Sequence, residues 1–322
     1  MALIKSISGI RGIIGGKPGK SLTPIDIVKF AAAYGTRLTR AEKGNHKVII
    51  GRDARLSGEM VSNLVANTLR ALGIHIIDLG LSTTPTVEMA VLHEEASGGI
   101  ILTASHNPGE DILRIAEEED FDFVDVKKLG SYTQDQSWLE KHINKIIELP
   151  LVDATAIAAA NFKIAIDAVN STGGIAVPML LTALGVAQDR IKKINCDPTG
   201  NFAHNPEPLP EHLHEISNEI KNGSYNLGIV VDPDVDRLAL ICEDGSPFGE
   251  EYTLVAVADY VLKHTPGNTV SNLSSSAALR DVTLKAGGSY AASAVGEVNV
   301  VALMKETDAV IGGEGNGGVI YP

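Results

Sequence analysis

Short apolar runs that end in an aspartate and a turn constrain the fold of this chain more than any other feature. The pattern recurs three times, and its turns read Gly51-Arg-Asp-Ala-Arg-Leu-Ser-Gly58, Asp167-Ala-Val-Asn-Ser-Thr-Gly-Gly174 and Asp232-Pro-Asp-Val-Asp-Arg237. Short β-branched runs that are closed by turn residues predict strands. Their recurrence indicates that similar α/β units repeat along the chain.

Segments with apolar residues at helical spacing lie between the predicted strands. We expect strands at residues 47–53, 163–167, 226–232 and 309–312, and helices at residues 24–40, 58–72, 175–184 and 251–262. This alternation predicts an α/β protein with parallel or mixed sheets.

The length of the chain predicts more than one domain. It has 322 residues, and 44% of them are apolar, which suffices for several packed cores. Linker-like segments give predicted domains at residues 1–150, 151–264 and 265–322. The third segment is short and ends directly after an apolar run, so we expect it to be only part of a domain.

The charge balance argues against some classes of partner. The formal net charge is −13, so we expect neither nucleic acid nor an anionic membrane as the main partner. Cys196 and Cys242 match neither a metal-ligand spacing nor a disulfide framework, and the N-terminus has no signal-peptide pattern. These features favour a cytoplasmic protein, and the sequence predicts no oligomeric state.

Three aspartates follow the predicted strand at residues 226–232. Alternate residues of an extended loop point the same way, so Asp232, Asp234 and Asp236 are expected to converge on one cation. Carboxylate oxygens without nearby His or Cys favour Mg²⁺ over zinc. An EF-hand needs glycine where Arg237 stands and is rejected, whereas a solvated acidic turn and a phosphatase with an aspartate nucleophile stay as alternatives.

The segment Thr103-Ala-Ser-His-Asn-Pro108 follows another apolar run. Its Asn-Pro turn places Ser105 on a loop at a strand end, where α/β proteins bind ligands. A serine hydrolase would need a G-x-S-x-G elbow, which is absent here. A phosphoryl carrier needs only a metal, cationic neighbours and correct positioning, and His106 would hydrogen-bond a phosphoryl oxygen. The alternative is an ordinary turn with a surface histidine.

Two glycine-rich segments complete the candidate site. In Ile311-Gly-Gly-Glu-Gly-Asn-Gly-Gly318 the glycines permit close approach of a ligand, and Glu314 and Asn316 are placed to contact sugar hydroxyls; a flexible linker is the alternative. Near the N-terminus, Arg11, Lys17 and Lys20 lie among glycines that suit phosphate binding. That segment imitates a Walker A loop but has Ile14 in place of the first glycine, so an NTPase is set aside.

The order of these segments is similar to that in the α-D-phosphohexomutase family. Gly-Ile-Arg-Gly at 9–12, Thr-Ala-Ser-His-Asn-Pro at 103–108, Asp-Pro-Asp-Val-Asp-Arg at 232–237 and Gly-Glu-x-x-Gly at 313–317 carry the resemblance. It implies three-layer α/β/α domains with mixed sheets around a central cleft. It also implies a smaller fourth domain, which we expect to be absent from this chain.

The resemblance also implies roles for individual residues. Ser105 would carry the phosphoryl group beside His106, with Mg²⁺ held by a phosphoryl oxygen on Ser105 and by the three aspartates. Arg11 and Arg237 would support the reacting group, and the sugar would meet Gly313, Glu314 and Asn316. A hexose phosphate would be the substrate and a hexose 1,6-bisphosphate the activator. Phosphoglucosamine mutase is favoured over phosphoglucomutase/phosphomannomutase.

Two departures from the family pattern affect this interpretation. The family continues after the Asn-Pro turn to a lysine that has no counterpart here, and Gly318 replaces a histidine of the sugar loop. A metal-dependent phosphatase and a non-catalytic phosphosugar-binding protein therefore stay as alternatives.

Overall fold

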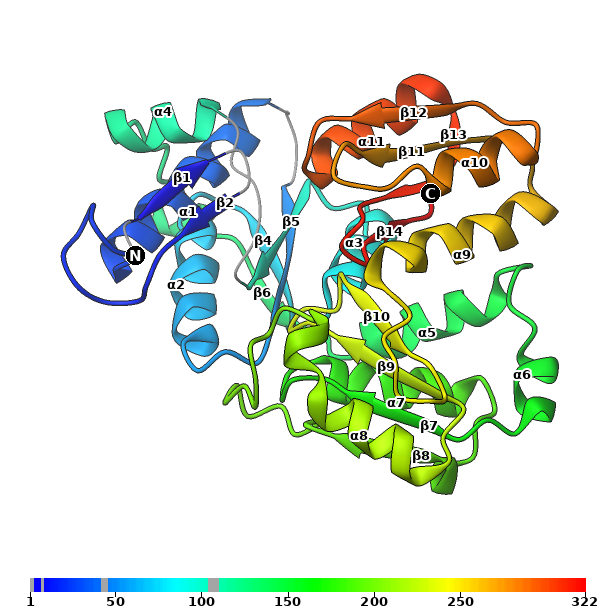
Figure 1. The fold of residues 1–322 in the computed structure, drawn as a ribbon. Coiled ribbons are helices and arrows are strands. Elements are labelled where there is room, and N and C mark those ends of the chain that lie inside the picture. Colours follow the sequence, from blue (N-terminus) through cyan, green and yellow to red (C-terminus); the bar gives the residue numbers. More distant parts are fainter. Residues whose placement is uncertain (1–2, 7–8, 42–45, 104–109) are drawn as a thin grey trace. The chain divides into compact units, whose positions relative to one another are not determined.

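The computed structural model describes residues 3–6, 9–41, 46–103 and 110–322. Their helices and strands form two compact units, Met1–His142 and Ile143–Pro322, whose elements are labelled in Figure 1. The domain boundaries expected at residues 150 and 264 stay predictions.

A parallel sheet forms the centre of the first unit. Its strands follow the order β5 (Gly98–Leu102), β3 (Lys47–Arg52), β4 (His75–Leu81) and β6 (Tyr132–Gln134). Alternate residues of β3 point to opposite faces of the sheet. Val48 and Ile50 therefore belong to one buried cluster and Ile49 to another.

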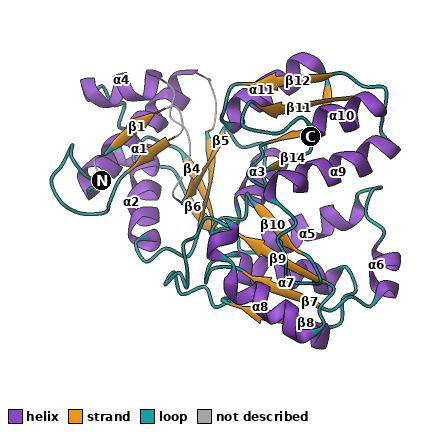
Figure 2. Ribbon diagram, viewed as in Figure 1, coloured by secondary structure: helices purple, strands orange, loops and turns teal. Residues whose placement is uncertain are grey.

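Helices cover both faces of this sheet, as Figure 2 shows in purple and orange. One face packs against α1 (Pro24–Ala41) and α2 (Gly58–Arg70). The other packs against α3 (Thr84–His93) and Trp138, the first residue of α5 (Trp138–Glu148). The first unit is therefore a three-layer α/β/α arrangement.

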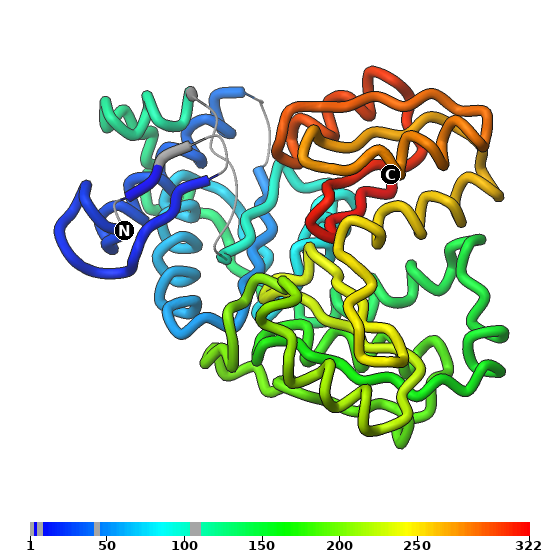
Figure 3. Tube along the Cα trace, in the orientation of Figure 1, coloured from blue at the N-terminus to red at the C-terminus, as the bar shows by residue number. Residues whose placement is uncertain are grey.

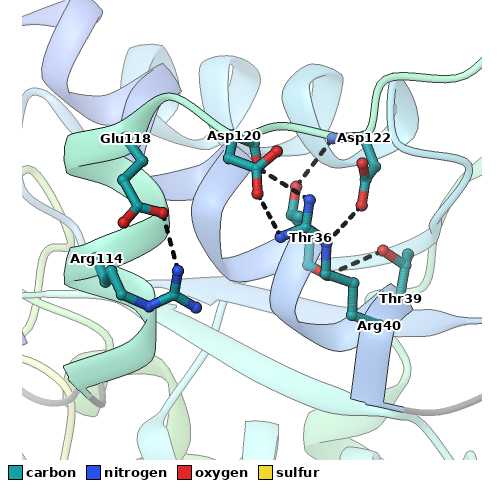
Figure 4. A network of polar contacts seen from close by, with 7 residues as sticks. All are labelled: Thr36, Thr39, Arg40, Arg114, Glu118, Asp120 and Asp122. Carbon is teal, nitrogen blue, oxygen red and sulfur yellow. Dashed lines mark hydrogen bonds and ion pairs between the residues drawn. The ribbon is translucent and has the colours of Figure 1, made fainter.

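A hairpin and a further helix are attached to α1. Strands β1 (Ile4–Ser6) and β2 (Gly9–Arg11) pair antiparallel, and α4 (Glu110–Glu118) packs its apolar face on α1. Arg40 anchors the chain beyond α4, because its Nε and Nη1 lie 2.7 and 2.9 Å from carboxylate oxygens of Asp122 and Asp120 (Figure 4).

The second unit contains two mixed sheets. In the first, β8 (Ile191–Ile194), β7 (Ile164–Asp167) and β9 (Leu227–Val231) are parallel, and β10 (Leu238–Ile241) is antiparallel to β9. Buried residues of β7 again alternate between two clusters. The helices of these two clusters are α6 (Ala154–Ala160) and α7 (Gly173–Ala183) on one face and α8 (His214–Gly223) on the other.

The second sheet of this unit repeats the arrangement. Strands β12 (Tyr290–Ser293), β11 (Asn268–Asn272) and β13 (Ala309–Gly313) are parallel, and the chain then returns as antiparallel β14 (Val319–Ile320), red in Figure 3. Its buried clusters include residues of α9 (Glu250–His264), α10 (Ala278–Lys285) and α11 (Glu297–Thr307).

The predicted fold class, α/β/α layers with mixed sheets, is confirmed. Each predicted strand and helix corresponds to an observed one within a few residues, as in β3, β7, β9, β13 and α1. Of the helices in the described part of the chain, none has both the length and the apolar character needed to cross a membrane.

Candidate functional site

The three aspartates lie in the loop that joins β9 to β10. Antiparallel pairing places Leu238 opposite Val231, so the intervening residues form a closed turn. Asp232 stabilises this turn, because its Oδ1 accepts hydrogen bonds from the backbone N–H groups of Asp236 at 3.1 Å and Arg237 at 3.2 Å. Val235 has φ of +64°, which is rare for a β-branched residue and indicates that the loop is strained.

The aspartate carboxylates converge as expected. One oxygen from each of Asp232, Asp234 and Asp236 lies within 4.8 Å of the others. Burial raises the pKa of Asp232 well above its ordinary value, and the carboxylates of Asp236 and Asp234 raise this pKa further. Asp236 Oδ1 is buried and accepts no hydrogen bond from a described residue. An oxygen-coordinated divalent cation fits these residues, because it would offset the repulsion and bind the unsatisfied oxygen.

Hydroxyl groups from a distant turn hold the aspartate loop. Ser171 Oγ and Thr172 Oγ1 each donate a hydrogen bond of 2.7 Å to the Pro233 carbonyl oxygen. A Cβ on Gly173 would lie 2.3 Å from Val231 Cγ2, so only glycine permits this approach. The turn at residues 167–174 was predicted as one of the repeated motifs, but its contact with the aspartate loop was not.

Arg237 is positioned by a second segment. Its Nη1 lies 3.4 Å from Glu207 Oε1, and its Nε lies 4.0 Å from Asp236 Oδ1. The segment that carries Glu207 is in turn attached to the end of β7, because His204 Nε2 lies 3.2 Å from Asp167 Oδ2. Glu207, His204 and Asp167 were not predicted to take part in the site.

The glycine-rich loop connects three strand ends. Glu314 Oε1 accepts hydrogen bonds from Asn272 Nδ2 at 2.6 Å and from the Gly296 N–H at 3.0 Å. Asn316 Nδ2 donates to Glu314 Oε2 at 3.3 Å. Glu314 therefore links the loops that follow β11, β12 and β13 through hydrogen bonds. The sequence did not predict this structural role.

The glycine-rich loop also contacts the aspartate loop. The Leu238 N–H, directly after Arg237, donates a hydrogen bond of 3.1 Å to the Gly317 carbonyl oxygen. A Cβ on Gly313 would lie 2.2 Å from the Gly318 carbonyl oxygen, and one on Gly317 would lie 2.6 Å from the Leu238 carbonyl oxygen. The glycines thus permit two candidate binding loops to lie side by side within the second unit.

A fourth carboxylate interacts electrostatically with both loops. Glu297 begins α11, and burial raises its pKa, with further contributions from the carboxylates of Asp236, Glu314 and Asp234. Sequence reasoning missed Glu297, since an acid in the first turn of a helix is common for reasons of local electrostatics alone.

The remaining candidates belong to the first unit. Arg11 ends β2 and lines a cavity of about 660 Å³ together with Arg55 and Thr103. Ser105 and His106 lie outside the described residues, between Thr103, directly after β5, and the start of α4 at Glu110. Their roles stay predictions from the sequence.

Comparisons with known families match nearly the whole chain. The three domain models described as phosphoglucomutase/phosphomannomutase, alpha/beta/alpha domains I, II and III, match residues 3–116, 140–245 and 249–322.

Curated relatives and solved structures agree with these matches. A phosphoglucomutase/phosphomannomutase of Thermococcus kodakarensis is 32% identical, and the alignment covers 98% of this chain and 72% of that protein. A phosphoglucosamine/phosphogalactosamine mutase of Sulfurisphaera tokodaii is 28% identical, and the alignment covers 100% of this chain and 73% of that protein. The crystal structure of a phosphoglucomutase/phosphomannomutase family protein from Burkholderia thailandensis matches with a TM-score of 0.79 and a sequence identity of 25%. The match covers 95% of this chain and 70% of that one.

A more distant structure was solved with ligands. It is an N-acetylphosphoglucosamine mutase of Aspergillus fumigatus in complex with GlcNAc-6P and magnesium, 16% identical with a TM-score of 0.51. The alignment covers 89% of this chain and 55% of that one, and at this identity the likeness concerns the fold alone.

Proposed function

Because this chain belongs to the α-D-phosphohexomutase family, whose members are intramolecular phosphotransferases, we propose that it is a phosphoglucosamine mutase. The reaction moves a phosphoryl group between C1 and C6 of a hexosamine phosphate. The observation that carries this proposal is the junction of the aspartate loop with the glycine-rich loop through the Leu238–Gly317 hydrogen bond. The junction would place the metal-binding aspartates and the residues for sugar recognition in one region of the second unit.

Ser105 carries the phosphoryl group in the proposed mechanism. The bond between its Oγ and phosphorus breaks as a sugar hydroxyl oxygen bonds to phosphorus. The hydroxyl proton leaves to a base, and the released Oγ takes up a proton to become a hydroxyl group. The resulting hexose 1,6-bisphosphate turns over and returns its other phosphoryl group to Ser105. Bisphosphate added from outside would therefore activate unphosphorylated protein.

Cationic groups stabilise the transferring group. Mg²⁺ held by Asp232, Asp234 and Asp236 would neutralise charge on the phosphoryl oxygens. Arg237 is oriented by Glu207 and Asp236, so its guanidinium needs little reorganisation to contact the same oxygens. Arg11 supplies a further cation, and Gly313, Glu314 and Asn316 shape the loop that meets the sugar.

The carboxylates of the second unit favour an amino sugar. Glu297 lies near Glu314, Asp234 and Asp236, whose negative charge raises its pKa. A protonated 2-amino group would be attracted to this region, whereas a neutral 2-hydroxyl group gains much less. The Sulfurisphaera relative, which is named for glucosamine and galactosamine phosphates, supports the same substrate class.

A substrate panel tests the proposal. Purified protein with Mg²⁺ and a trace of hexose 1,6-bisphosphate is offered the 6-phosphates of glucosamine, glucose and mannose. We expect the highest kcat/KM for glucosamine 6-phosphate and the loss of turnover in Ser105→Ala. A preference for glucose or mannose phosphate would instead assign the phosphoglucomutase/phosphomannomutase activity. Release of inorganic phosphate that is unaffected by Ser105→Ala would contradict the mutase mechanism.

A further inference from the structure

Two buried hydroxyl groups outside the aspartate loop share one of its carbonyl oxygens. Ser171 and Thr172 are 0% and 2% exposed, and each donates a hydrogen bond of 2.7 Å to the Pro233 carbonyl oxygen. Two such bonds use both lone pairs of that oxygen. The carbonyl group that lies in the chain between Asp232 and Asp234 is therefore occupied and cannot serve as a ligand to a cation.

Helix capping does not explain the hydrogen bond of Thr172. This residue is the N-cap of α7, where a threonine hydroxyl group ordinarily accepts a hydrogen bond from an N–H group of the first turn. The Thr172 side chain makes no such capping bond. Its hydroxyl group instead donates to a carbonyl oxygen that is 61 residues away in sequence. The hydroxyl group therefore serves the aspartate loop rather than its own helix.

The two hydroxyl groups fix the backbone next to Asp234. Because a peptide group is planar, fixing the Pro233 carbonyl also fixes the Asp234 N–H and the plane from which the Asp234 side chain starts. Asp232 fixes the other half of the loop, where its Oδ1 accepts a hydrogen bond from the Asp236 N–H. Between these anchors, Val235 has φ of +64°, a conformation that persists only where the surroundings impose it. The anchors therefore hold the three carboxylates in place before any cation binds.

The turn that carries the two hydroxyl groups is itself well supported. Asp167 is 1% exposed, and its Oδ1 accepts a hydrogen bond of 3.0 Å from the Val169 N–H. Its Oδ2 lies 3.2 Å from both Asn195 Nδ2 and His204 Nε2. Val169 is held at φ of +47°, another rare conformation for a β-branched residue. Because the turn is fixed independently, loss of one hydroxyl group is expected to affect the aspartate loop rather than the turn.

We propose that Ser171 and Thr172 are positioning residues that make the aspartate loop selective for Mg²⁺ over Ca²⁺. This inference rests on the cation site of the proposed function and adds two residues to it. Mg²⁺ requires nearly ideal octahedral geometry and few protein ligands, whereas Ca²⁺ takes about six to eight oxygens, including backbone carbonyls, in flexible geometry. Fixed carboxylates beside an occupied carbonyl suit the smaller ion. A loop that moves and offers that carbonyl suits the larger one.

Competition for bound Mn²⁺ tests the proposal without any substrate. The electron paramagnetic resonance signal of free Mn²⁺ reports how much Mg²⁺ or Ca²⁺ displaces Mn²⁺ from the purified protein, which gives the Kd of each ion. Thr172→Val removes the hydroxyl group and keeps the shape of the side chain. It is expected to weaken Mg²⁺ binding about tenfold and to change the Kd of Ca²⁺ by less than about twofold. The selectivity for Mg²⁺ should therefore fall about tenfold.

Three further variants provide the controls. Thr172→Ser keeps the hydroxyl group and should retain the wild-type Kd for both ions. Thr182→Val is the matched control on the same helix and should change neither Kd, because Thr182 Oγ1 donates to a different proline carbonyl, that of Pro178, at 2.8 Å. Ser171→Ala removes the other bond to the Pro233 carbonyl. It should repeat the loss of selectivity, and it provides the same test if Thr172→Val does not fold.

The outcomes separate this inference from the proposed function. Wild-type protein that binds no Mn²⁺ would overturn the cation site and the inference together. Wild-type protein that binds Mn²⁺ and converts glucosamine 6-phosphate, with Kd values that are unchanged in Thr172→Val, would overturn the inference alone. Equal weakening of Mg²⁺ and Ca²⁺ binding would overturn the selectivity. A loss in Thr172→Ser as large as that in Thr172→Val would show that side-chain packing, and not the hydroxyl group, positions the loop.

Discussion

At the scale of single residues, His204 shows how the environment sets a charge. Its Nε2 lies 3.2 Å from Asp167 Oδ2 and its Nδ1 2.7 Å from the Asn205 carbonyl oxygen, and both partners can only accept. The hydrogen bond to Asp167 raises the pKa of His204, although burial opposes the shift. The geometry therefore favours an imidazolium that clamps the segment before Glu207.

The clamp predicts a pH-dependent contribution to stability. Because the folded-state pKa of His204 is raised, its stabilisation is complete below the unfolded-state pKa of about 6.5 and is lost as the pH rises through the folded-state value. His204→Asn should lower the free energy of unfolding by about 1 kcal/mol at pH 5.5 and by less at pH 9. Denaturant titrations across this range measure the difference. A difference between the two proteins that is constant with pH would contradict the imidazolium. His264→Asn, at the exposed last residue of α9, serves as the control.

Glu297 carries a prediction about substrate choice. Replacing its carboxylate by an amide keeps the size of the side chain and removes one negative charge near Glu314 and Asp236. Glu297→Gln should lower kcat/KM for glucosamine 6-phosphate about tenfold and leave that for glucose 6-phosphate within about twofold. Parallel assays with both sugars measure the ratio. An equal loss of kcat/KM for both sugar phosphates would contradict a role of Glu297 in recognising the amine.

At the scale of elements, burial outweighs surface ion pairs in holding α4. Ile115 on α4 is 3% exposed and lies in the cluster shared with α1, whereas Arg40 and its partners Asp120 and Asp122 are exposed (Figure 4). Exposed ion pairs contribute little because water screens them and side-chain entropy opposes them. The apolar face of α4 therefore supplies most of its attachment.

Two substitutions compare these contributions. Ile115→Ala should destabilise the first unit by roughly 2–5 kcal/mol, because it removes buried methyl groups and leaves a cavity. Arg40→Ala should destabilise it much less. Thermal unfolding measures both effects, and a larger loss for Arg40→Ala would contradict the stated order.

At the scale of the whole molecule, the site was predictable where its residues are close in sequence. Asp232, Asp234 and Asp236 share one loop, so their convergence followed from strand geometry alone. Glu297 and Asn272 reach the same region from other strand ends, and only the sheet order β12-β11-β13-β14 brings them together. Their roles required the folded chain.

The helices and central strands were predictable for a similar reason. Apolar periodicity is a local signal, and it located β3, β7 and β9 within a few residues. Partially exposed strands such as β8 and β12 carry a weak pattern, so they were missed. The Asp53–Thr103 contact joins two neighbouring strand ends that are far apart in sequence, which no local pattern reveals.

Cation binding should stabilise the two units differently. Mg²⁺ at the aspartate loop is expected to slow amide hydrogen exchange in β9 and β10. The free energy of unfolding of this region should rise by about 2.7 kcal/mol when the free Mg²⁺ concentration is about 100 times Kd. Exchange in the first unit should change little. Asp236→Asn should abolish the effect, and Asp244→Asn, in the exposed turn after β10, should keep it. Protection that persists in Asp236→Asn would place the cation elsewhere.

The phosphorylation state of Ser105 tests the central claim most directly. The purified protein is incubated with Mg²⁺ and a hexose 1,6-bisphosphate, digested, and mapped by mass spectrometry. The mutase mechanism predicts one phosphoryl group, located on Ser105 and transferable to a hexose monophosphate. An unmodified Ser105 accompanied by released inorganic phosphate would contradict it.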